Sequence, residues 1–416
     1  DRCAAATARD RCAADTARDR CAADTARDRC AADTARGGRH DDAGARSRAA
    51  PGGTDHWAAD AARDKARADA EVGAQLFTHY PIRSWDAYLG PRDRHLHVAA
   101  APQPDEALDL RDLTPRAGRL LDDAGFHVTP DGGTVVTTRW NDAEDLRDRR
   151  LDLVALDATT GEEHVLAADR SWHWSPSCSP DGSHVVCLRE VDTTPGDYTL
   201  LLVDLDTRQS RDLTLHLDLW PQAPVWSPDG TAVFFTADQD GRTPAFRVDL
   251  DSGQVTRLAS RGAFSDLTPS PDGARLYALR AMVTSSPHPV ALNTAAADQE
   301  PRTFSDTFGA MDLHGSIERV SVAAADGAEV SSWLLPDRAA ADEPVPLAVF
   351  IHGGPLNSWS GWHWRWSPHV LTARGWAVLL PDPGLSTGYG RAFVERGWGR
   401  WAPSSTTTSC ARWTGW

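Results

Sequence analysis

Residues 223–235 have the sequence Ala-Pro-Val-Trp-Ser-Pro-Asp-Gly-Thr-Ala-Val-Phe-Phe, with a short apolar run on each side of the turn Ser227-Pro-Asp-Gly230. Proline fixes φ at the first corner of such a turn, aspartate caps its own backbone, and glycine takes the positive φ that returns the chain. The flanking runs have the length and composition of β-strands. This stretch therefore predicts a β-hairpin.

The same turn occurs three more times along the chain, at Thr129–Gly132, Ser179–Gly182 and Ser270–Gly273, with 43 to 50 residues between successive copies. A second hairpin follows most copies, as at Phe246–Leu258. Four strands per unit at this period are typical of β-propeller blades, whereas a β-sandwich explains the hairpins but not their recurrence. We predict an incomplete β-propeller over residues 56–315. Within it we expect an exposed helix at residues 57–76 and a less regular blade at residues 80–114.

The pattern changes from residue 316 onward. A hairpin, Glu318–Val322 and Val330–Leu335, is followed by the apolar run Leu347–Ile351, which predicts a buried strand. A helix is expected around residues 368–374 and a further strand at residues 377–380. Strand, loop, helix and strand in this order are typical of α/β proteins. We expect residues 316–401 to be the N-terminal part of an α/β-hydrolase domain.

The predicted strand Leu347–Ile351 ends in His352-Gly353-Gly354-Pro355. In α/β-hydrolases an HGG-type loop after a strand supplies one backbone N–H of the oxyanion hole. Glycine allows bare backbone to approach the substrate oxygen. We predict that these four residues form an oxyanion loop, with the N–H coming from one of the glycines and His352 acting as a hydrogen-bonded scaffold.

A second motif, Gly384-Leu-Ser-Thr-Gly388, fits the letters G-x-S-x-G and makes Ser386 a candidate nucleophile. A nucleophile elbow needs a strand running straight into the serine and a helix running straight out of it. Pro381 and Pro383 interrupt that approach. The sequence therefore favours a structural loop here over a catalytic serine.

The two ends of the chain have a different character. Residues 1–36 are four copies of a nine-residue unit, Asp-Arg-Cys-Ala-Ala-Asp-Thr-Ala-Arg, with Ala6 replacing aspartate in the first copy. Its cysteines fall on alternating helix faces, so the unit builds neither an apolar stripe nor a metal cluster. We expect residues 1–55 to be non-native or disordered. Residues 402–416 fit no element, and we expect a frameshifted tail there.

Composition excludes several classes of function. The formal net charge of the 416 residues is −16, which argues against a nucleic-acid partner. No apolar run approaches the ~20 residues of a membrane helix and no signal peptide opens the chain, so we expect no membrane partner and a cytoplasmic location. The cysteines lack zinc-ligand spacing, and Cys178 and Cys187 are expected to be buried thiols. We predict no metal and no cofactor.

The blades followed by His-Gly-Gly-Pro resemble the prolyl oligopeptidase family of serine peptidases, most closely the bacterial acylaminoacyl-peptidase and dipeptidyl-aminopeptidase-like branch. The resemblance also uses residues 80–91, 379–390 and 396–401. It implies a propeller that restricts entry to short peptides, and a hydrolase that releases residues or acyl-amino acids through an acyl-enzyme. It implies further blades before this stretch and most of the hydrolase after it, so that the chain is a fragment. It places Trp359, Trp362, Trp364 and Trp366 in the pocket wall, although aromatic packing explains them equally well.

The order of residues argues that the catalytic triad is missing. In this fold the triad runs serine, then aspartate or glutamate, then histidine. No histidine follows His369, and the only acid after Ser386 is Glu395. We therefore predict an inactive fragment of a serine peptidase. The alternatives are a propeller that binds peptides or proteins without catalysis, and a broken gene product without activity.

Overall fold

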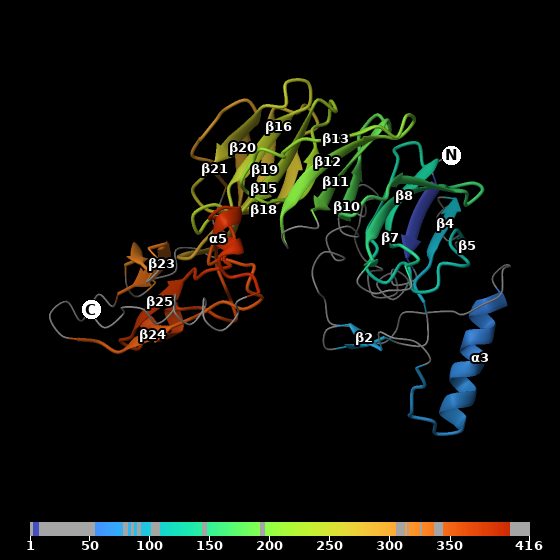
Figure 1. Ribbon diagram of the computed structural model, residues 1–416, viewed down its shortest axis with the longest axis horizontal. Coiled ribbons are helices and arrows are strands. Elements are labelled where there is room, and N and C mark those ends of the chain that lie inside the picture. The colour runs from blue at the N-terminus through green and yellow to red at the C-terminus, as the bar shows by residue number, and fades with distance from the viewer. Residues whose placement is uncertain are drawn as a thin grey trace. The chain divides into compact units, whose positions relative to one another are not determined.

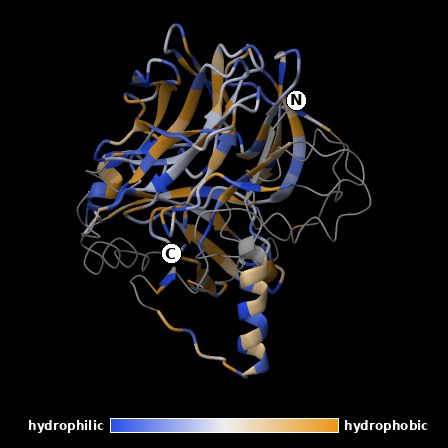
Figure 2. Ribbon diagram, turned by 90° about the vertical axis from the view of Figure 1, so that its right-hand side faces the viewer, coloured by the Kyte–Doolittle hydropathy of each residue, from blue (hydrophilic) through white to orange (hydrophobic). Residues whose placement is uncertain are grey.

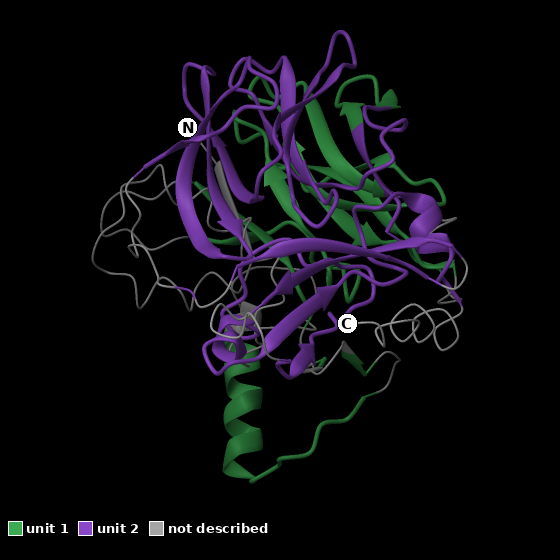
Figure 3. Cartoon of the chain, turned by 90° about the vertical axis from the view of Figure 1, so that its left-hand side faces the viewer, with its two compact units in different colours: residues 1–189, 202–211 green, residues 190–201, 212–416 purple. Residues whose placement is uncertain are grey.

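The computed structural model of the protein describes residues 3–7, 55–77, 82–84, 87–89, 93–100, 109–143, 148–191, 196–304, 313, 316–324, 327–336 and 344–399. The chain divides into two compact units, residues 1–189 with 202–211 and residues 190–201 with 212–416 (Figure 3). The predicted tail at residues 402–416, and all of the tandem repeat except Cys3–Thr7, lie outside the described residues.

Four sheets of four strands follow one another along the chain (Figure 1). The first has β6 (Phe126–Val128), β7 (Thr134–Trp140), β8 (Leu151–Asp157) and β9 (Glu163–Ala167). The second has β10 (Trp172–Cys178), β11 (His184–Glu190), β12 (Tyr198–Asp204) and β13 (Ser210–Asp212). The third has β14 (Pro221–Trp226), β15 (Ala232–Ala237), β16 (Ala245–Asp249) and β17 (Val255–Ala259). The fourth has β18 (Ala263–Pro269), β19 (Arg275–Met282), β20 (Ser285–Asn293) and β21 (Arg302–Thr303).

In each of these sheets the strands are ordered as they occur in the sequence, so that each sheet is a meander. This arrangement is that of propeller blades and confirms the predicted fold class. The second sheet contains Cys178 and Cys187, which are buried and form no disulfide.

The predicted Pro-Asp-Gly turn joins the first two strands of every blade. In the third blade Gly230 has φ +70° and its N–H donates to Ser227 O over 2.9 Å. Asp229 Oδ1 accepts the Ser227 hydroxyl at 2.6 Å and the Thr231 N–H at 3.1 Å. The turn thus satisfies its own polar groups, which explains why the Pro-Asp-Gly sequence recurs in each blade.

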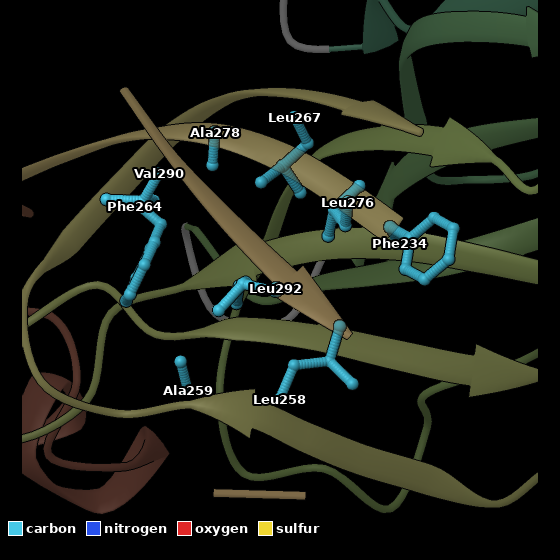
Figure 4. Packing of buried hydrophobic residues seen from close by; sticks show 10 residues of the cluster. Phe234, Leu258, Ala259, Phe264, Leu267, Leu276, Ala278, Val290 and Leu292 are labelled. Carbon is cyan, nitrogen blue, oxygen red and sulfur yellow. The ribbon is translucent and has the colours of Figure 1, made fainter. Parts of the chain in front are cut away.

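Apolar side chains fill the space between the third and fourth blades (Figure 4). Phe234 of β15 and Leu258 of β17 pack with Phe264, Leu276 and Leu292 of the fourth blade, and all five are at most 2% exposed. This cluster follows from the alternation of apolar residues along each strand, which places one face of each sheet toward its neighbour.

The segment before the first blade is less regular. Most residues of helix α3 (Asp55–Asp69) from residue 58 onward are exposed, and Figure 2 shows both hydrophilic and hydrophobic residues along its ribbon. An exposed helix was expected at residues 57–76, whereas the helix of the structure begins at Asp55 and ends at Asp69. A two-stranded hairpin, β2 (Arg83–Ser84) with β3 (Ala87–Tyr88), comes next. It is followed by a three-stranded sheet in the order β1-β4-β5, with β4 at Leu96–Ala100 and β5 at Arg111–Asp112.

Strand β1 (Cys3–Thr7) corrects the expectation for the first residues of the chain. Residues 1–55 were expected to be non-native or disordered, but residues 3–7 are ordered in a strand that pairs antiparallel with β4 along its whole length. The physical reason is that an unpaired strand edge offers backbone donors and acceptors to any extended segment. Side-chain pattern, which was the basis of the expectation, does not govern such pairing.

The last sheet has the order β22-β23-β25-β24 and confirms the predicted change to an α/β pattern. Its strands are β22 (Glu318–Ala323), β23 (Glu329–Leu335), β25 (Ala377–Pro381) and β24 (Leu347–Val349). Strands β24 and β25 are parallel, with helix α4 (His369–Thr372) in the connection between them. Helix α5 (Arg391–Glu395) follows β25 and was not predicted.

The prediction that Leu347–Ile351 is a buried strand is wrong. Leu347, Val349 and Ile351 are 42, 44 and 56% exposed, and the strand ends at Val349. Strand β24 lies at the edge of its sheet, so among the described residues only β25 pairs with it. Hydrophobicity predicted the strand but not its place in the sheet.

No helix of the described part is long and apolar enough to cross a membrane.

Candidate active site

Two loops meet at one edge of the last sheet, because β24 and β25 are parallel neighbours and their carboxyl ends lie side by side. The loop after β24 is held to the sheet by Phe350, whose N–H donates to Leu379 O at 2.9 Å. His352 then turns inward, with a side chain only 5% exposed. Gly353 and Gly354 are exposed, and no atom lies within 4 Å of where a Cβ would stand on either. Bare backbone therefore faces open space, as the oxyanion interpretation requires.

The loop after β25 begins with Asp382, whose side chain is fully buried. Ser386 is also fully buried, and its N–H donates to Pro383 O at 3.0 Å. The residue before it, Leu385, has a positive φ of 85°. The chain thus makes a tight turn at residues 383–386 instead of continuing into a helix.

Hydrogen bonds join the two loops. His352 Nε2 and Ser386 Oγ are 2.9 Å apart. Asp382 Oδ1 accepts the Trp359 N–H at 2.8 Å, and Thr387 N–H donates to Asn357 O at 3.0 Å. The loop that carries the glycines after His352 is therefore joined to the loop after β25 through a buried network.

Asp382 is the electrostatic centre of the network. Burial raises its pKa to about 6, against hydrogen bonds from Tyr389 and the Trp359 N–H and the charge of Arg319, while Asp238 adds a smaller upward effect. Tyr389 donates its hydroxyl proton to Asp382 Oδ2 at 2.6 Å and accepts a hydrogen bond from Arg319 Nη2 at 2.8 Å. Arg319 thus reaches the carboxylate through a phenol.

His352 is held neutral by its surroundings. Burial lowers the pKa of its imidazole, with a smaller opposing contribution from the Gly353 backbone. A neutral histidine next to a buried hydroxyl suits a scaffold, because the ring makes a hydrogen bond without adding a second buried charge. The scaffold role of His352 stays a prediction.

Ser386, His352 and Asp382 have the residue types of a catalytic triad but not its geometry. In a triad the serine contacts Nε2 and the carboxylate contacts Nδ1. Here Asp382 Oδ1 lies 3.8 Å from Nε2, the nitrogen that already contacts Ser386.

The backbone around Ser386 also differs from an elbow, in which the serine itself sits on a strained turn between strand and helix. The positive φ falls on Leu385, and α5 begins only at Arg391. Full burial further keeps the Ser386 hydroxyl from a substrate carbonyl. In this structure Ser386 is a buried hydrogen-bond partner of His352.

The four tryptophans predicted for a pocket wall have three different surroundings. Trp359 is 5% exposed and donates its indole N–H to Phe350 O at 2.9 Å, so it is part of the core beneath the loop. Trp362 stacks on His369 with centroids 5.4 Å apart. Trp364 and Trp366 are 63 and 55% exposed. The structure thus brings only Trp359 to the network, and the pocket-wall role of the others stays a prediction.

Sequence reasoning did not single out Asp382, Tyr389 or Arg319. A carboxylate directly after a buried strand, at the edge where a site is expected, is a signal that could have found Asp382. Arg319 carries no such signal, because its contact with Tyr389 joins distant parts of the sequence. Among the described residues no group of three or more histidine, cysteine, aspartate or glutamate side chains is placed to hold a metal ion.

Comparison with known proteins agrees with this architecture. Residues 144–308 match the model of the TolB β-propeller domain. Dipeptidyl-peptidase 5 of Schizosaccharomyces pombe is 25% identical over 228 residues, which are 53% of this chain and 33% of that protein. Dipeptidyl-peptidase 5 of Aspergillus fumigatus is 24% identical over 253 residues, which are 57% of this chain and 34% of that protein. The chain spans about a third of the length of these curated relatives.

Solved structures show the same fold. An acylaminoacyl peptidase in complex with Z-Gly-Gly-Phe-chloromethyl ketone matches 81% of this chain and 51% of its own, with a TM-score of 0.64 and 15% identity. The Pyrococcus horikoshii acylaminoacyl peptidase gives the same coverage and TM-score at 16% identity. These similarities support the resemblance to the prolyl oligopeptidase family. Two solved structures thus share most of this chain's fold, and the resemblance drawn from sequence is confirmed.

Proposed function

We propose that this protein is a serine-type peptidase that acts on short peptides and releases residues or acyl-amino acids through an acyl-enzyme. The observation that carries the proposal is the pair of exposed glycines, Gly353 and Gly354, at the carboxyl end of β24. Relatives named dipeptidyl-peptidase 5 and acylaminoacyl peptidase support the reaction class.

In this proposal the loop acts by stabilising charge. An N–H of Gly353 or Gly354 donates to the oxygen that becomes negative when a nucleophile adds to the peptide carbonyl. One such donor typically contributes about 3–4 kcal/mol to the transition state. His352, Ser386 and Asp382 hold the loop and take no part in bond making.

The nucleophile is not among the residues that the network brings together. Ser386 lacks triad and elbow geometry, and no histidine follows His369 in the sequence. We therefore propose that the 416 residues supply the blades and the oxyanion loop, and that by themselves they do not hydrolyse peptides. We place the protein in the cytoplasm, where thiols such as Cys178 and Cys187 stay reduced.

Binding of a charged tetrahedral ligand tests the oxyanion role without requiring turnover. The ligand is a short acyl-dipeptide whose terminal carboxyl is replaced by a phosphonate, and its partner is the matching dipeptide amide. We expect the phosphonate to bind at least about tenfold more tightly, which corresponds to about 1.4 kcal/mol. Equal affinities would contradict the proposal and favour a binding module without catalysis.

A matched pair of variants assigns the donor. Gly353→Ala keeps the backbone N–H, and the space around a Cβ there is open. Gly353→Pro removes the N–H at a φ outside the positive region. If Gly353 is the donor, only the proline variant loses the preference for the phosphonate. If both variants keep it, the donor is Gly354.

A further inference from the structure

Three aspartates from the connections between blade strands contact Thr387, in the loop after β25, or Arg391, the first residue of helix α5. Asp238 lies directly after β15, and its Oδ2 accepts the Thr387 hydroxyl at 2.6 Å. Asp218 lies between β13 and β14, and its Oδ1 accepts the Arg391 N–H at 2.8 Å. Asp197, just before β12, forms an ion pair with the Arg391 guanidinium. All these residues belong to the second compact unit.

The backbone of the segment from Thr387 to Arg391 is shaped for close approach. Gly388 has φ +85°, and a Cβ on it would stand 2.8 Å from the backbone carbon of Asp238 and from the Gln239 nitrogen. The Asp240 N–H donates to Gly388 O at 3.1 Å. A side chain at position 388 would therefore separate the two backbones, which is a physical reason for glycine there.

The same segment is bonded to the candidate oxyanion loop. Thr387 follows Ser386, whose hydroxyl contacts His352 Nε2, and the Thr387 N–H donates to Asn357 O. Displacement of Thr387 therefore moves Ser386, the hydrogen-bond partner of His352. A continuous chain of contacts runs from Asp238 through Thr387 and Ser386 to His352.

We propose that Asp197, Asp218 and Asp238 are positioning residues that hold the segment Ser386–Arg391 and, through it, His352 and the glycines that follow. The blades then form part of the site and not only its cover. We call the contacts of these three aspartates with Ser386–Arg391 the clamp. The function of the clamp rests on the proposed oxyanion role of the loop, whereas its effect on His352 can be measured separately.

The test uses two threonines that share one carboxylate. Thr387 donates to Asp238 Oδ2 from the clamped segment, and Thr243 donates to Oδ1 at 2.8 Å from the same blade. Thr387→Val and Thr243→Val each remove one hydroxyl from Asp238. Only Thr387→Val interrupts the chain of contacts between Asp238 and His352. Both variants can lose stability, so a measurement on His352 itself is needed to distinguish them.

The signal is the titration of His352, followed by NMR in protein with 13C-labelled histidine and assigned with His352→Gln. In Thr387→Val the loosened loop admits water, and we expect the pKa of His352, which burial lowers, to rise toward its ordinary value. Thr243→Val and Thr387→Ser are expected to titrate as the unmodified protein does. Equal titration of all four proteins overturns the proposal.

A second variant covers the case in which Thr387→Val does not fold. Arg391→Gln removes the ion pair with Asp197, and Arg257→Gln is its control because it removes the ion pair with Asp298 elsewhere in the same unit. Only Arg391→Gln should shift His352. If His352 shifts but the unmodified protein does not prefer the phosphonate, the clamp stands and the proposed function fails. If the preference exists and neither Thr387→Val nor Arg391→Gln shifts His352, the clamp fails alone.

Discussion

At the scale of single residues, Asp382 shows how a site is built from contacts that the sequence does not reveal. Its carboxylate is fully buried, yet it accepts hydrogen bonds from a backbone N–H and a tyrosine and has a guanidinium behind the tyrosine. These partners come from three separate stretches of sequence. The motif His352–Pro355 was visible in the sequence, whereas the group that anchors it was not.

The raised pKa of Asp382 gives a test based on stability. The pKa of Asp382 in the folded protein is about 6, above the ordinary 3.8. The contribution of Asp382 to the free energy of unfolding is therefore full below about pH 4 and is lost as the pH rises through 6. Asp382→Asn removes this dependence. The free energy of unfolding of the unmodified protein, relative to the variant, should fall by roughly 2–3 kcal/mol between pH 4 and pH 8.

Denaturant unfolding at several pH values measures this difference. Asp298→Asn is the control, because Arg257 lowers the pKa of Asp298 and its contribution grows with pH instead. If the free energy of unfolding changes with pH in the same way for the unmodified protein and for Asp382→Asn, the carboxylate of Asp382 is solvated and the prediction is wrong.

At the scale of elements, the predictions succeeded where local chemistry determines the structure. The Pro-Asp-Gly turn satisfies its own polar groups, so four copies predicted four hairpins. Strand β24 was predicted from its apolar residues, but its exposure depends on the strand order β22-β23-β25-β24, which no local pattern encodes. Helix α5 is only five residues long and was missed, because such a length shows no apolar periodicity.

The exposed edge strand β24 predicts self-association. An open strand with apolar side chains is a template for pairing with another chain, and a lysine on it opposes such pairing. Val349→Lys should weaken self-association on the order of tenfold. Val370→Lys is the control, because Val370 is 55% exposed but lies on helix α4.

Sedimentation velocity over a range of protein concentrations compares the three proteins. If Val349→Lys and Val370→Lys associate equally, or if the unmodified protein is a monomer throughout, the edge strand is not the contact.

At the scale of the whole molecule, the period of the turns was enough to predict blades, and the change of pattern at residue 316 was enough to predict an α/β sheet after them. The resemblance to a family needed more than these two features, because it rested on His352–Pro355 and on residues 80–91, 379–390 and 396–401. The contacts of the aspartates with Ser386–Arg391 were beyond prediction, because they join blade connections to a loop far away in the sequence.

The account rests on the claim that Ser386 holds the oxyanion loop and is not a nucleophile. The most direct test treats the purified, phosphonate-binding chain and its Ser386→Ala variant with a fluorophosphonate, followed by intact-mass and peptide mass spectrometry. A fluorophosphonate modifies only a serine activated by a base and open to solvent. We predict no adduct on either protein. An adduct on Ser386 that is absent from the variant would contradict the account and make residues 384–388 a true nucleophile elbow.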